Sequence, residues 1–467
     1  MKHKVLIKTL LLIVLPFIAM SQKDSTVTLS LNDAQQYAIT HNLNLENARL
    51  DIESAEKKVW ETTAIGLPQI NGNLSYQYIP GDIPTASFGS DSSTAVLYGY
   101  IFNSLSTLEA FHGANILDDI PVMAEAEPFT LGVKNSTTYS VTVSQLVFSG
   151  EWIVGLQASK TYLKISTLSH EKQKQEIKAG VITSYISILI LENNLKILDS
   201  TVENMESLVK ETKLLSEKGF LESTDADQLQ INLNTLINSR NTVQRQIEVS
   251  YMLFKILLGT DLNSNLVLNE NLDAIYNQFV LGNQNQEFKL LNNIDYRMLS
   301  NQVEITELSY KREKTKYLPT ISAFYNYQDK TNKASFDFTI NHIIGVNLDM
   351  PIFSSFSRNA VVQQAKIEYQ KTLNNQILLE NNLKTTEQQL GFNFTNALDK
   401  YNITIQNVEL SKNVYDNITK KYKLGMVSSM DLTQANNTYL QSQSDNTSAL
   451  FELFKTKIEL EKILNEL

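Results

Sequence analysis

Residues 65–78 read IGLPQINGNLSYQY, and residues 316–327 read KYLPTISAFYNY. In each stretch a Leu-Pro pair precedes a run in which apolar and polar residues alternate. Alternation with a period of two is typical of a β-strand that has an apolar environment on one side and water on the other. Residues 139–144 and 344–350 alternate in the same way. The sequence therefore predicts two β-hairpins.

The two hairpins belong to an internal duplication. Pro68 and Pro319 are separated by 251 positions, whereas QLVFS at 145–149 and MPIFS at 350–354 are separated by 205 positions. Because the matching segments occur in the same order, the chain contains two structural repeats. The difference of 46 positions places a large insertion in the first hairpin only, within residues 79–136.

This insertion is rich in turn-forming and acidic residues, which favours a long, solvated surface loop. Its carboxylates could alternatively bind a cation, but they lack a fixed ligand spacing. The acidic residues are Asp82, Asp91, Asp118, Asp119, Glu125 and Glu127.

The N-terminus has the features of a secretory signal peptide. Lysines precede an apolar run at 10–18, and small residues precede a cleavage site before Gln22, so we expect residues 1–21 to be removed. The chain contains no cysteine, which excludes disulfides and an N-terminal lipid on cysteine. Its formal charge of −10 argues against a nucleic-acid partner.

The predicted strands fit either a soluble sheet packed on a core or a sheet in a membrane. The signal peptide permits an outer-membrane destination, and no other segment offers a compact core on which such a sheet could lie. No stretch after the signal peptide approaches the roughly 20 apolar residues of a membrane helix. In lipid, every backbone polar group must be paired, and four strands cannot close a barrel. We therefore expect several copies of the chain to close it together.

Two proline-free stretches, 129–318 and 352–467, predict very long helices. The segment from Gly150 to Gly219 would measure roughly 105 Å as a helix. Its apolar residues recur with the alternating spacing of three and four that is typical of a coiled coil. They are Ile188, Leu191, Leu195, Leu198, Val202, Met205 and Val209, and the pattern continues with Leu229, Leu233, Leu236, Val243, Ile247, Phe254 and Leu257.

Each long helix is predicted to fold back at a glycine, at KGFLESTD (218–225) and at LGMVSSMD (424–431). Glycine favours the end of one helix, and Ser or Thr favours the start of the next. Ser428 with Asp431, and Thr224 with Asp227, have the spacing of helix-start pairs. The apolar residues after each glycine would be exposed, which suggests a docking surface for a partner. These residues are Phe220, Leu221, Met426 and Val427.

In these features the chain resembles the TolC-like outer-membrane efflux proteins. The resemblance rests on LNDA at 31–34 with Ala38 and Asn42, on both Leu-Pro strand starts, and on both glycine turns. It implies a mainly α-helical fold with transmembrane β-strands. Three copies would form a 12-stranded barrel in the bacterial outer membrane, and their coiled-coil helical hairpins would form a tunnel in the periplasm. The implied function is efflux of small molecules, with a periplasmic adaptor and an inner-membrane pump as partners.

The resemblance also implies roles for particular residues. A pore gate at the tip of the tunnel would include Tyr422, linked to Thr224 or Asp225, and acidic rings at Asp431 and at position 434. Here position 434 is Gln434, and an arginine expected at 427 is Val427. Asp431 is equally well explained as a helix-start residue. Adaptor docking would use Gly219, Phe220, Leu221, Gly425, Met426 and Val427, in addition to the structural role of the two glycines.

The predicted organisation is a signal peptide (1–21), a first repeat (22–259), an inter-repeat segment (260–287) and a second repeat (288–467) with its β-hairpin at 320–352. No set of residues with the spacing of a catalytic site or a metal site occurs, and the five histidines do not pair at ligand spacing. We therefore expect no enzyme activity, cofactor or metal. The histidines are His3, His41, His112, His170 and His342.

Two alternative functions are a channel for type I protein secretion and a coiled-coil spacer of the envelope without a pore.

Overall fold

The structure is a computed structural model that describes residues 27–86, 129–130, 132–280, 287–334 and 337–467. The predicted signal peptide and most of the insertion lie outside the described residues. The chain divides into two compact units. The first comprises Met1–Ser54, Leu163–Val303 and Thr372–Leu467, and the second comprises Ala55–Tyr162 and Glu304–Lys371.

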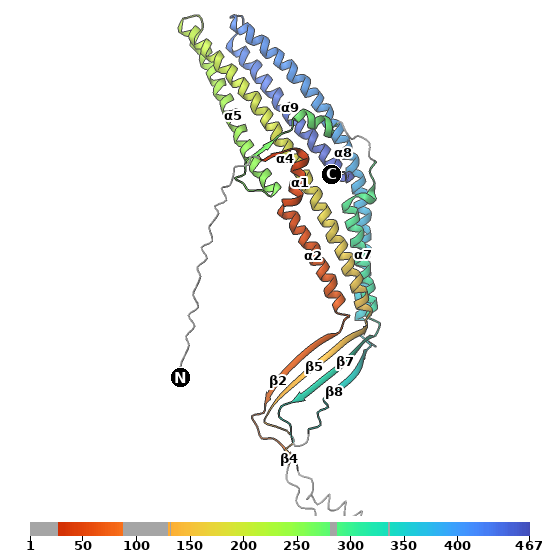
Figure 1. The fold of residues 1–467 in the computed structure, drawn as a ribbon. Coiled ribbons are helices and arrows are strands. Elements are labelled where there is room, and N and C mark those ends of the chain that lie inside the picture. Colours follow the sequence, from red (N-terminus) through yellow and green to blue (C-terminus); the bar gives the residue numbers. More distant parts are fainter. Residues whose placement is uncertain (1–26, 87–128, 131, 281–286, 335–336) are drawn as a thin grey trace, which may run out of the picture. The chain divides into compact units, whose positions relative to one another are not determined.

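Helices and strands follow the order that the duplication predicts, with long helical pairs after each strand pair (Figure 1). In the first repeat they are β1 (Val27–Leu29), α1 (Leu31–His41), α2 (Leu43–Ala64), β2 (Gln69–Tyr78), β3 (Thr85–Ala86), β4 (Phe129–Thr130), β5 (Asn135–Phe148), α4 (Gly150–Glu217) and α5 (Ser223–Leu258). They continue with β6 (Leu266–Leu268), α6 (Leu272–Ile275), the π-helix η2 (Tyr276–Val280), the 3-10 helix η3 (Leu290–Asn292), α7 (Ile294–Thr315), β7 (Thr320–Lys330), β8 (His342–Asp349), α8 (Ser357–Lys423) and α9 (Ser429–Leu464).

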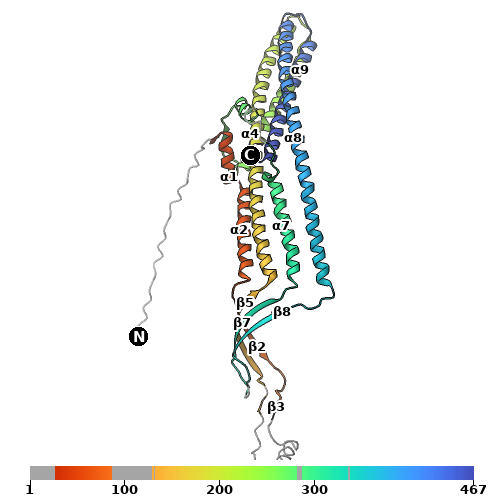
Figure 2. The same ribbon diagram turned by 90° about the vertical axis from the view of Figure 1, so that its right-hand side faces the viewer.

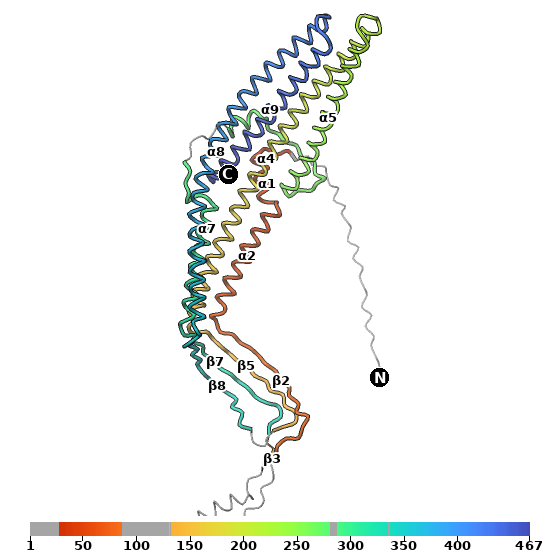
Figure 3. Tube along the Cα trace, turned by 180° about the vertical axis from the view of Figure 1, so that it is seen from behind, coloured from red at the N-terminus to blue at the C-terminus, as the bar shows by residue number. Residues whose placement is uncertain are grey.

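In the first unit, α4 with α5 and α8 with α9 form two helical hairpins whose turns lie at the same end (Figure 3). Apolar side chains from all four helices pack between the hairpins near the turns. We call this set the tip cluster; it comprises Leu198, Val202, Met205, Leu208, Val209, Leu229, Leu233, Leu236, Tyr415, Tyr422, Leu432, Ala435 and Tyr439. The residues that the coiled-coil spacing predicted along α4 and α5 are thus buried or half-buried.

A second core of the first unit lies where α1, the middle of α4 and the ends of α5 and α9 meet. Ala34 and Ala38 are fully buried in it, and Ser30 and Asp33 form a capping box at the start of α1. Gly259 has a φ of 75°, and a Cβ atom there would lie 2.2 Å from the backbone oxygen of His41. The sequence features at 31–34 and at Ala38 are therefore explained by helix capping and by close packing in this core.

Among the described residues, α4 is the one helix that is long and apolar enough to span a membrane, so the expectation that no such stretch follows the signal peptide is wrong. Its apolar middle instead forms part of this core, because Val181, Tyr185 and Ile188 are fully buried. The Tyr185 hydroxyl donates a hydrogen bond to the Leu29 carbonyl at 3.0 Å. Burial of this kind is the behaviour of a core helix.

The second unit contains a four-stranded antiparallel sheet in the order β2-β5-β7-β8, and the strands curve together (Figure 2). Two of the observed strands, β5 and β7, are longer than the alternating runs indicated. In particular, β5 begins at Asn135, inside the segment predicted as a loop, and β7 extends to Lys330. Residues 135–138 are all polar, so their sequence does not alternate and carries no strand signal.

The strand ends join the helices differently in the two repeats. α4 starts directly after β5, and the Trp152 indole covers Gly66 and donates a hydrogen bond to the Thr62 carbonyl at 2.8 Å. In the second repeat, residues 350–356 separate β8 from α8. Phe356 in this connection has a φ of 63°, a conformation that side chains rarely adopt.

Candidate functional site

The register of the sheet gathers most of the apolar residues on one face and most of the polar residues on the other, with Phe324 and Ile343 as apolar exceptions on the polar face. Ile70 lies opposite Val143, Val143 opposite Tyr325, and Tyr325 opposite Ile344, so one apolar row crosses all four strands. The neighbouring row is Asn71, Thr142, Asn326 and Ile343. We call the first surface the apolar face and the second the polar face.

The apolar face is exposed within the described part of the chain. Ile70 is 72% exposed and Ile344 is 83% exposed, and Leu74, Tyr76, Val346 and Leu348 are exposed as well. Monomeric soluble proteins rarely expose a contiguous apolar surface that crosses a whole sheet. Side chains of the polar face hydrogen-bond across strands, as Asn326 Nδ2 does to Thr142 Oγ1 at 2.7 Å. The sheet thus fits lipid on one side and water on the other.

The sheet also has two open edges, because in the described residues β2 and β8 each pair with one neighbour only. Unpaired backbone groups of an edge strand are costly in lipid, where water is absent. A chain of this design requires additional strands from other copies.

The second candidate site is formed by the two turns of the helical hairpins. Gly219 and Gly425 have φ values of 77° and 72°, in the left-handed region. At the first turn the Phe220 amide donates to the Leu215 carbonyl at 2.9 Å, and at the second the Met426 amide donates to the Lys421 carbonyl at 2.9 Å. This is the hydrogen-bond pattern that ends a helix at a left-handed residue.

The apolar residues after the glycines differ in exposure. Phe220 is 75% exposed and Met426 is 72% exposed, in agreement with the predicted surface. Leu221 and Val427 are half-buried, and Val427 packs against the tip cluster, so the prediction of exposure is wrong for these two residues. Leu424 and Met430 are exposed at the second turn and were missed, although both are apolar residues beside the glycine turn.

Tyr422 is buried in the tip cluster, and its hydroxyl shares a hydrogen bond of 3.3 Å with Thr212 of α4. The expected link from Tyr422 to Thr224 or Asp225 is not formed in this structure. Thr224 donates to the Glu222 carboxylate at 3.1 Å. Burial raises the pKa of the Tyr422 hydroxyl, the hydrogen bond to Thr212 lowers it, and the nearby Asp225 carboxylate raises it further.

Asp225 is instead used between the hairpins, because it accepts a hydrogen bond from the Ser429 hydroxyl of α9. A second polar contact joins α5 to α9, where Asn232 Nδ2 donates to Thr433 Oγ1 at 2.6 Å. An ion pair of 3.4 Å joins Lys423 of α8 to Glu211 of α4. These contacts hold the two hairpins together near their turns.

Asp431 has the helix-start role that its spacing predicted. The Ser428 hydroxyl accepts from the Asp431 amide at 3.2 Å, and the Asp431 carboxylate accepts from the Ser428 amide at 3.0 Å. The Ser428 hydrogen bonds lower the pKa of the Asp431 carboxyl, so the exposed side chain is charged at neutral pH. Gln434 is exposed on α9, one turn further along.

The matching prediction for Thr224 and Asp227 is wrong. The residue before α5 is Glu222, and its side chain makes no capping hydrogen bond. The helix starts at Ser223, two positions earlier than the Thr-x-x-Asp spacing required, so Thr224 lies inside its first turn.

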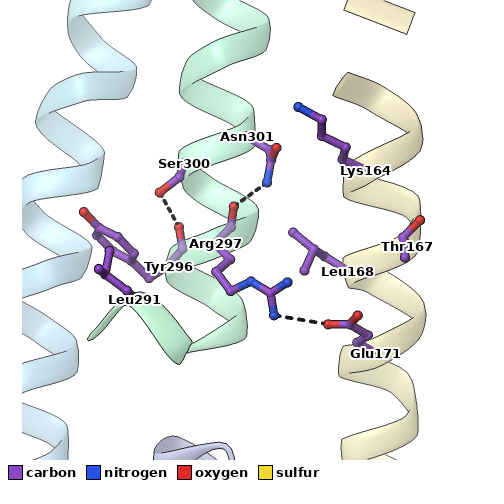
Figure 4. Close-up of a pocket in the computed structure, with 9 residues that line it drawn as sticks. All are labelled: Lys164, Thr167, Leu168, Glu171, Leu291, Tyr296, Arg297, Ser300 and Asn301. Atoms are coloured by element: carbon purple, nitrogen blue, oxygen red, sulfur yellow. Dashed lines mark hydrogen bonds and ion pairs between the residues drawn. The ribbon is translucent and has the colours of Figure 1, made fainter. Parts of the chain in front are cut away.

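Outside these regions the described residues offer shallow grooves and no cluster of three or more potential metal ligands. A groove of about 430 Å³ lies between α4 and α7, where Arg297 and Glu171 form an ion pair of 3.3 Å across it (Figure 4). Its lining side chains are mixed in polarity, and Lys164, Thr167, Leu291 and Asn301 point in different directions (Figure 4).

Residues 289–466 match the family model described as outer membrane efflux protein. The second repeat therefore carries an outer membrane efflux protein domain. No match is found among curated proteins.

Comparison with solved structures extends the likeness to 93% of the chain. The structure of CusC matches with a TM-score of 0.70 at 13% identity, over 93% of this chain and 91% of that chain. CmeC of Campylobacter jejuni matches with a TM-score of 0.69 at 16% identity, over 93% and 85%. VceC of Vibrio cholerae matches with a TM-score of 0.67 at 13% identity, over 93% and 95%. These structures confirm the predicted TolC-like fold.

Proposed function

We propose that this chain is one protomer of an outer-membrane channel through which a tripartite system exports small molecules. The observation that carries the proposal is the sheet, which combines an exposed apolar face, a polar face and two open edges. Lipid and further copies of the chain are the surroundings that satisfy all three properties. An envelope spacer without a pore would have no use for such a sheet.

In this proposal three copies form a homotrimer with twelve strands in the outer membrane. The two repeats, 22–259 and 288–467, each contribute one strand pair and one long helical hairpin. The hairpins form the wall of a tunnel in the periplasm, and their turns meet a periplasmic adaptor that connects to an inner-membrane pump. The family match and the fold of the similar channels support this arrangement.

The turns would also narrow the tunnel. Asp431 is exposed and charged, and three copies would bring three such carboxylates around one axis. A ring of carboxylates attracts cations and repels anions at close range. Tyr422, Thr224, Asp225 and Gln434 would lie at the same constriction, where Tyr422 and Asp225 help to hold the hairpins in place.

Conductance measurements test the channel. The purified protein is expected to form a trimer that gives discrete conductance steps in a planar lipid bilayer. Asp431→Asn should weaken block by divalent cations, because it removes the charge while an Asn oxygen can still accept the capping hydrogen bonds. Ser428→Ala removes the cap and keeps the charge, so it should leave the block unchanged. A monomeric product without conductance would refute the channel.

Chemical cross-linking tests the docking surface. Phe220→Asp and Met426→Asp place charges on the two exposed apolar side chains of the turns, and they should abolish cross-linking to the adaptor. Phe392→Asp is the matched control, because Phe392 is similarly exposed but lies in the middle of α8. All three variants should still insert into membranes. Equal cross-linking in all variants would remove the turns from the docking surface.

A further inference from the structure

The duplication extends to the hydrogen-bond register of the two strand pairs. In the first repeat Gln69 lies opposite Ser144. Moving Gln69 by 251 positions and Ser144 by 205 positions gives Thr320 and Asp349, which are opposite each other in the second repeat. The same two shifts carry Tyr76 and Thr137 to Tyr327 and His342, another observed pair. The two hairpins are therefore equivalent residue by residue.

One further strand pair, β5 with β7, joins the first repeat to the second. In it Ser144 lies opposite Phe324 and Val143 lies opposite Tyr325. If the repeats alternate around a closed barrel, the second repeat of one copy must meet the first repeat of the next copy in an equivalent way. The strands that meet there are β8 and β2, the two open edges.

Applying the same shifts to the pair of β5 and β7 predicts this missing interface. We propose that β8 of one copy pairs antiparallel with β2 of the next copy, with Asp349 opposite Asn73 and Leu348 opposite Leu74. This inference rests on the proposed channel function and adds the register of the contact between copies. The register continues with Asn347 opposite Ser75, Val346 opposite Tyr76 and Ile344 opposite Tyr78.

The chemistry of the strands agrees with this register. Exposed apolar residues of β8 (Ile344, Val346 and Leu348) meet exposed apolar residues of β2 (Tyr78, Tyr76 and Leu74), so the apolar face continues from copy to copy. A slip by one residue would move Val346 and Leu348 opposite polar residues of β2, namely Asn73, Ser75 or Gln77.

A polar contact is retained as well. Within the chain, Asn326 donates to Thr142 across the pair of β7 and β5 at 2.7 Å. The equivalent positions at the interface are Ser75 and Asn347, so an amide and a hydroxyl again lie opposite each other, on exchanged strands.

The end of the proposed pairing between β8 and β2 also corresponds to the end of the observed pairing between β5 and β7. The observed pairing of β5 with β7 is regular up to Leu146 and becomes irregular between Leu146 and Phe148. Leu146 corresponds to Pro351, which has no amide hydrogen to donate. Proline is tolerated at the end of a strand or at a bulge, and this is where the proposed register places it.

Engineered disulfides can measure the register, because the chain has no cysteine of its own. Opposite residues of antiparallel strands have Cα atoms about 4.5 or 5.5 Å apart, within the range of a disulfide, whereas diagonal neighbours are about 7–8 Å apart. The variants S75C/N347C and L74C/L348C should give covalent dimers and trimers when the purified trimer is oxidised. Because adjacent pairs alternate in ladder type, the two variants cover both geometries.

Slipped pairs are the matched controls. N73C/N347C and Q77C/N347C place the cysteines two positions away from the proposed partner, and they should cross-link at least tenfold more slowly. Single variants S75C and N347C should give no covalent trimer. T142C/N326C tests the equivalent pair inside one chain. Oxidation should there form a disulfide within the chain, so both thiols stop reacting with a thiol reagent and no covalent dimer or trimer appears.

The outcomes separate the register from the channel itself. Faster cross-linking of a slipped pair would overturn the register, and the absence of every cross-link between copies in a conducting trimer would overturn the pairing of β8 with β2. Either result would leave the channel function intact. A protein that forms neither trimers nor conductance would instead refute the proposed function.

Discussion

At the scale of single residues, the two turn glycines are required by the conformation of the backbone. A Cβ atom at Gly219 or Gly425 would meet no other atom within 4 Å, so space does not require glycine there. The backbone conformation does, because both residues have φ above 70°. The duplication retains glycine at both places for this reason, whether or not a partner docks beside it.

The conformational requirement for glycine at the turns gives a prediction about stability. Gly425→Ala forces a side chain into the left-handed region and should destabilise the protein by roughly 1–2 kcal/mol per chain. Gly391→Ala is the matched control, because Gly391 lies inside α8, where an added Cβ also meets nothing within 4 Å. In a helix interior, alanine should stabilise by roughly 0.5–1 kcal/mol. Urea unfolding followed by circular dichroism should therefore show opposite shifts, and shifts of the same sign would contradict the conformational argument.

Other single-residue interactions at the tip were not predictable from spacing. Tyr422 bonds to Thr212, and Asp225 accepts from Ser429, because these contacts depend on how two helical hairpins pack. The capping box of Ser428 and Asp431 was predictable because both partners lie within one turn of sequence. Local hydrogen bonds can thus be predicted from a sequence, whereas contacts between hairpins require the structure.

At the scale of elements, the alternation predicted the strands because a sheet with one apolar face repeats its environment every second residue. It underestimated β5, whose first residues are polar on both faces. The helices were predicted from their apolar spacing and the absence of proline. The break between α1 and α2 at Asn42 was not predicted. The Asn42 side chain accepts from the Asn44 and Leu45 amides at 2.9 and 3.2 Å, and it also donates to the Leu257 carbonyl at 2.7 Å, 215 positions away.

The apolar face of the sheet makes a prediction at this scale. Val141 lies on the apolar face near the middle of β5, and Ser140 lies beside it on the polar face. Val141→Arg should destabilise the protein folded in lipid by roughly 2–4 kcal/mol, which is the cost of an arginine at the bilayer midplane. Ser140→Arg adds the same charge on the side facing water and should cost far less. Folding yields into lipid vesicles measure the difference, and equal yields would mean that the two faces are assigned wrongly.

At the scale of the whole molecule, duplication and oligomerisation act together. One chain supplies four strands whose internal registers obey a single pair of offsets, and its two free edges are complementary under the same offsets. An assembly built this way alternates equivalent repeats around its axis. The two helical hairpins differ at their turns, where Asp431 and Asp225 occupy corresponding positions but have different partners.

This difference suggests that opening of the tunnel depends on how firmly the hairpins hold each other. The tip cluster, the Asn232 contact and the ion pair between Lys423 and Glu211 join them. Lys423→Glu replaces the ion pair with repulsion between two half-exposed carboxylates, which is worth roughly 0.2–1 kcal/mol per chain. Because 1.4 kcal/mol corresponds to a tenfold change, the open probability in a planar bilayer should rise by up to about fivefold per chain.

Adding Glu211→Lys to Lys423→Glu restores an ion pair of reversed polarity and should return the open probability to its original value. Lys213→Glu is the control for charge alone, because Lys213 bonds to Gln230 at 2.7 Å within one hairpin and does not join the two. The effect of Lys423→Glu should shrink at high salt, since exposed charges are screened. If Lys213→Glu opened the channel as strongly, the net charge of the tip would control opening, and the contact between hairpins would not.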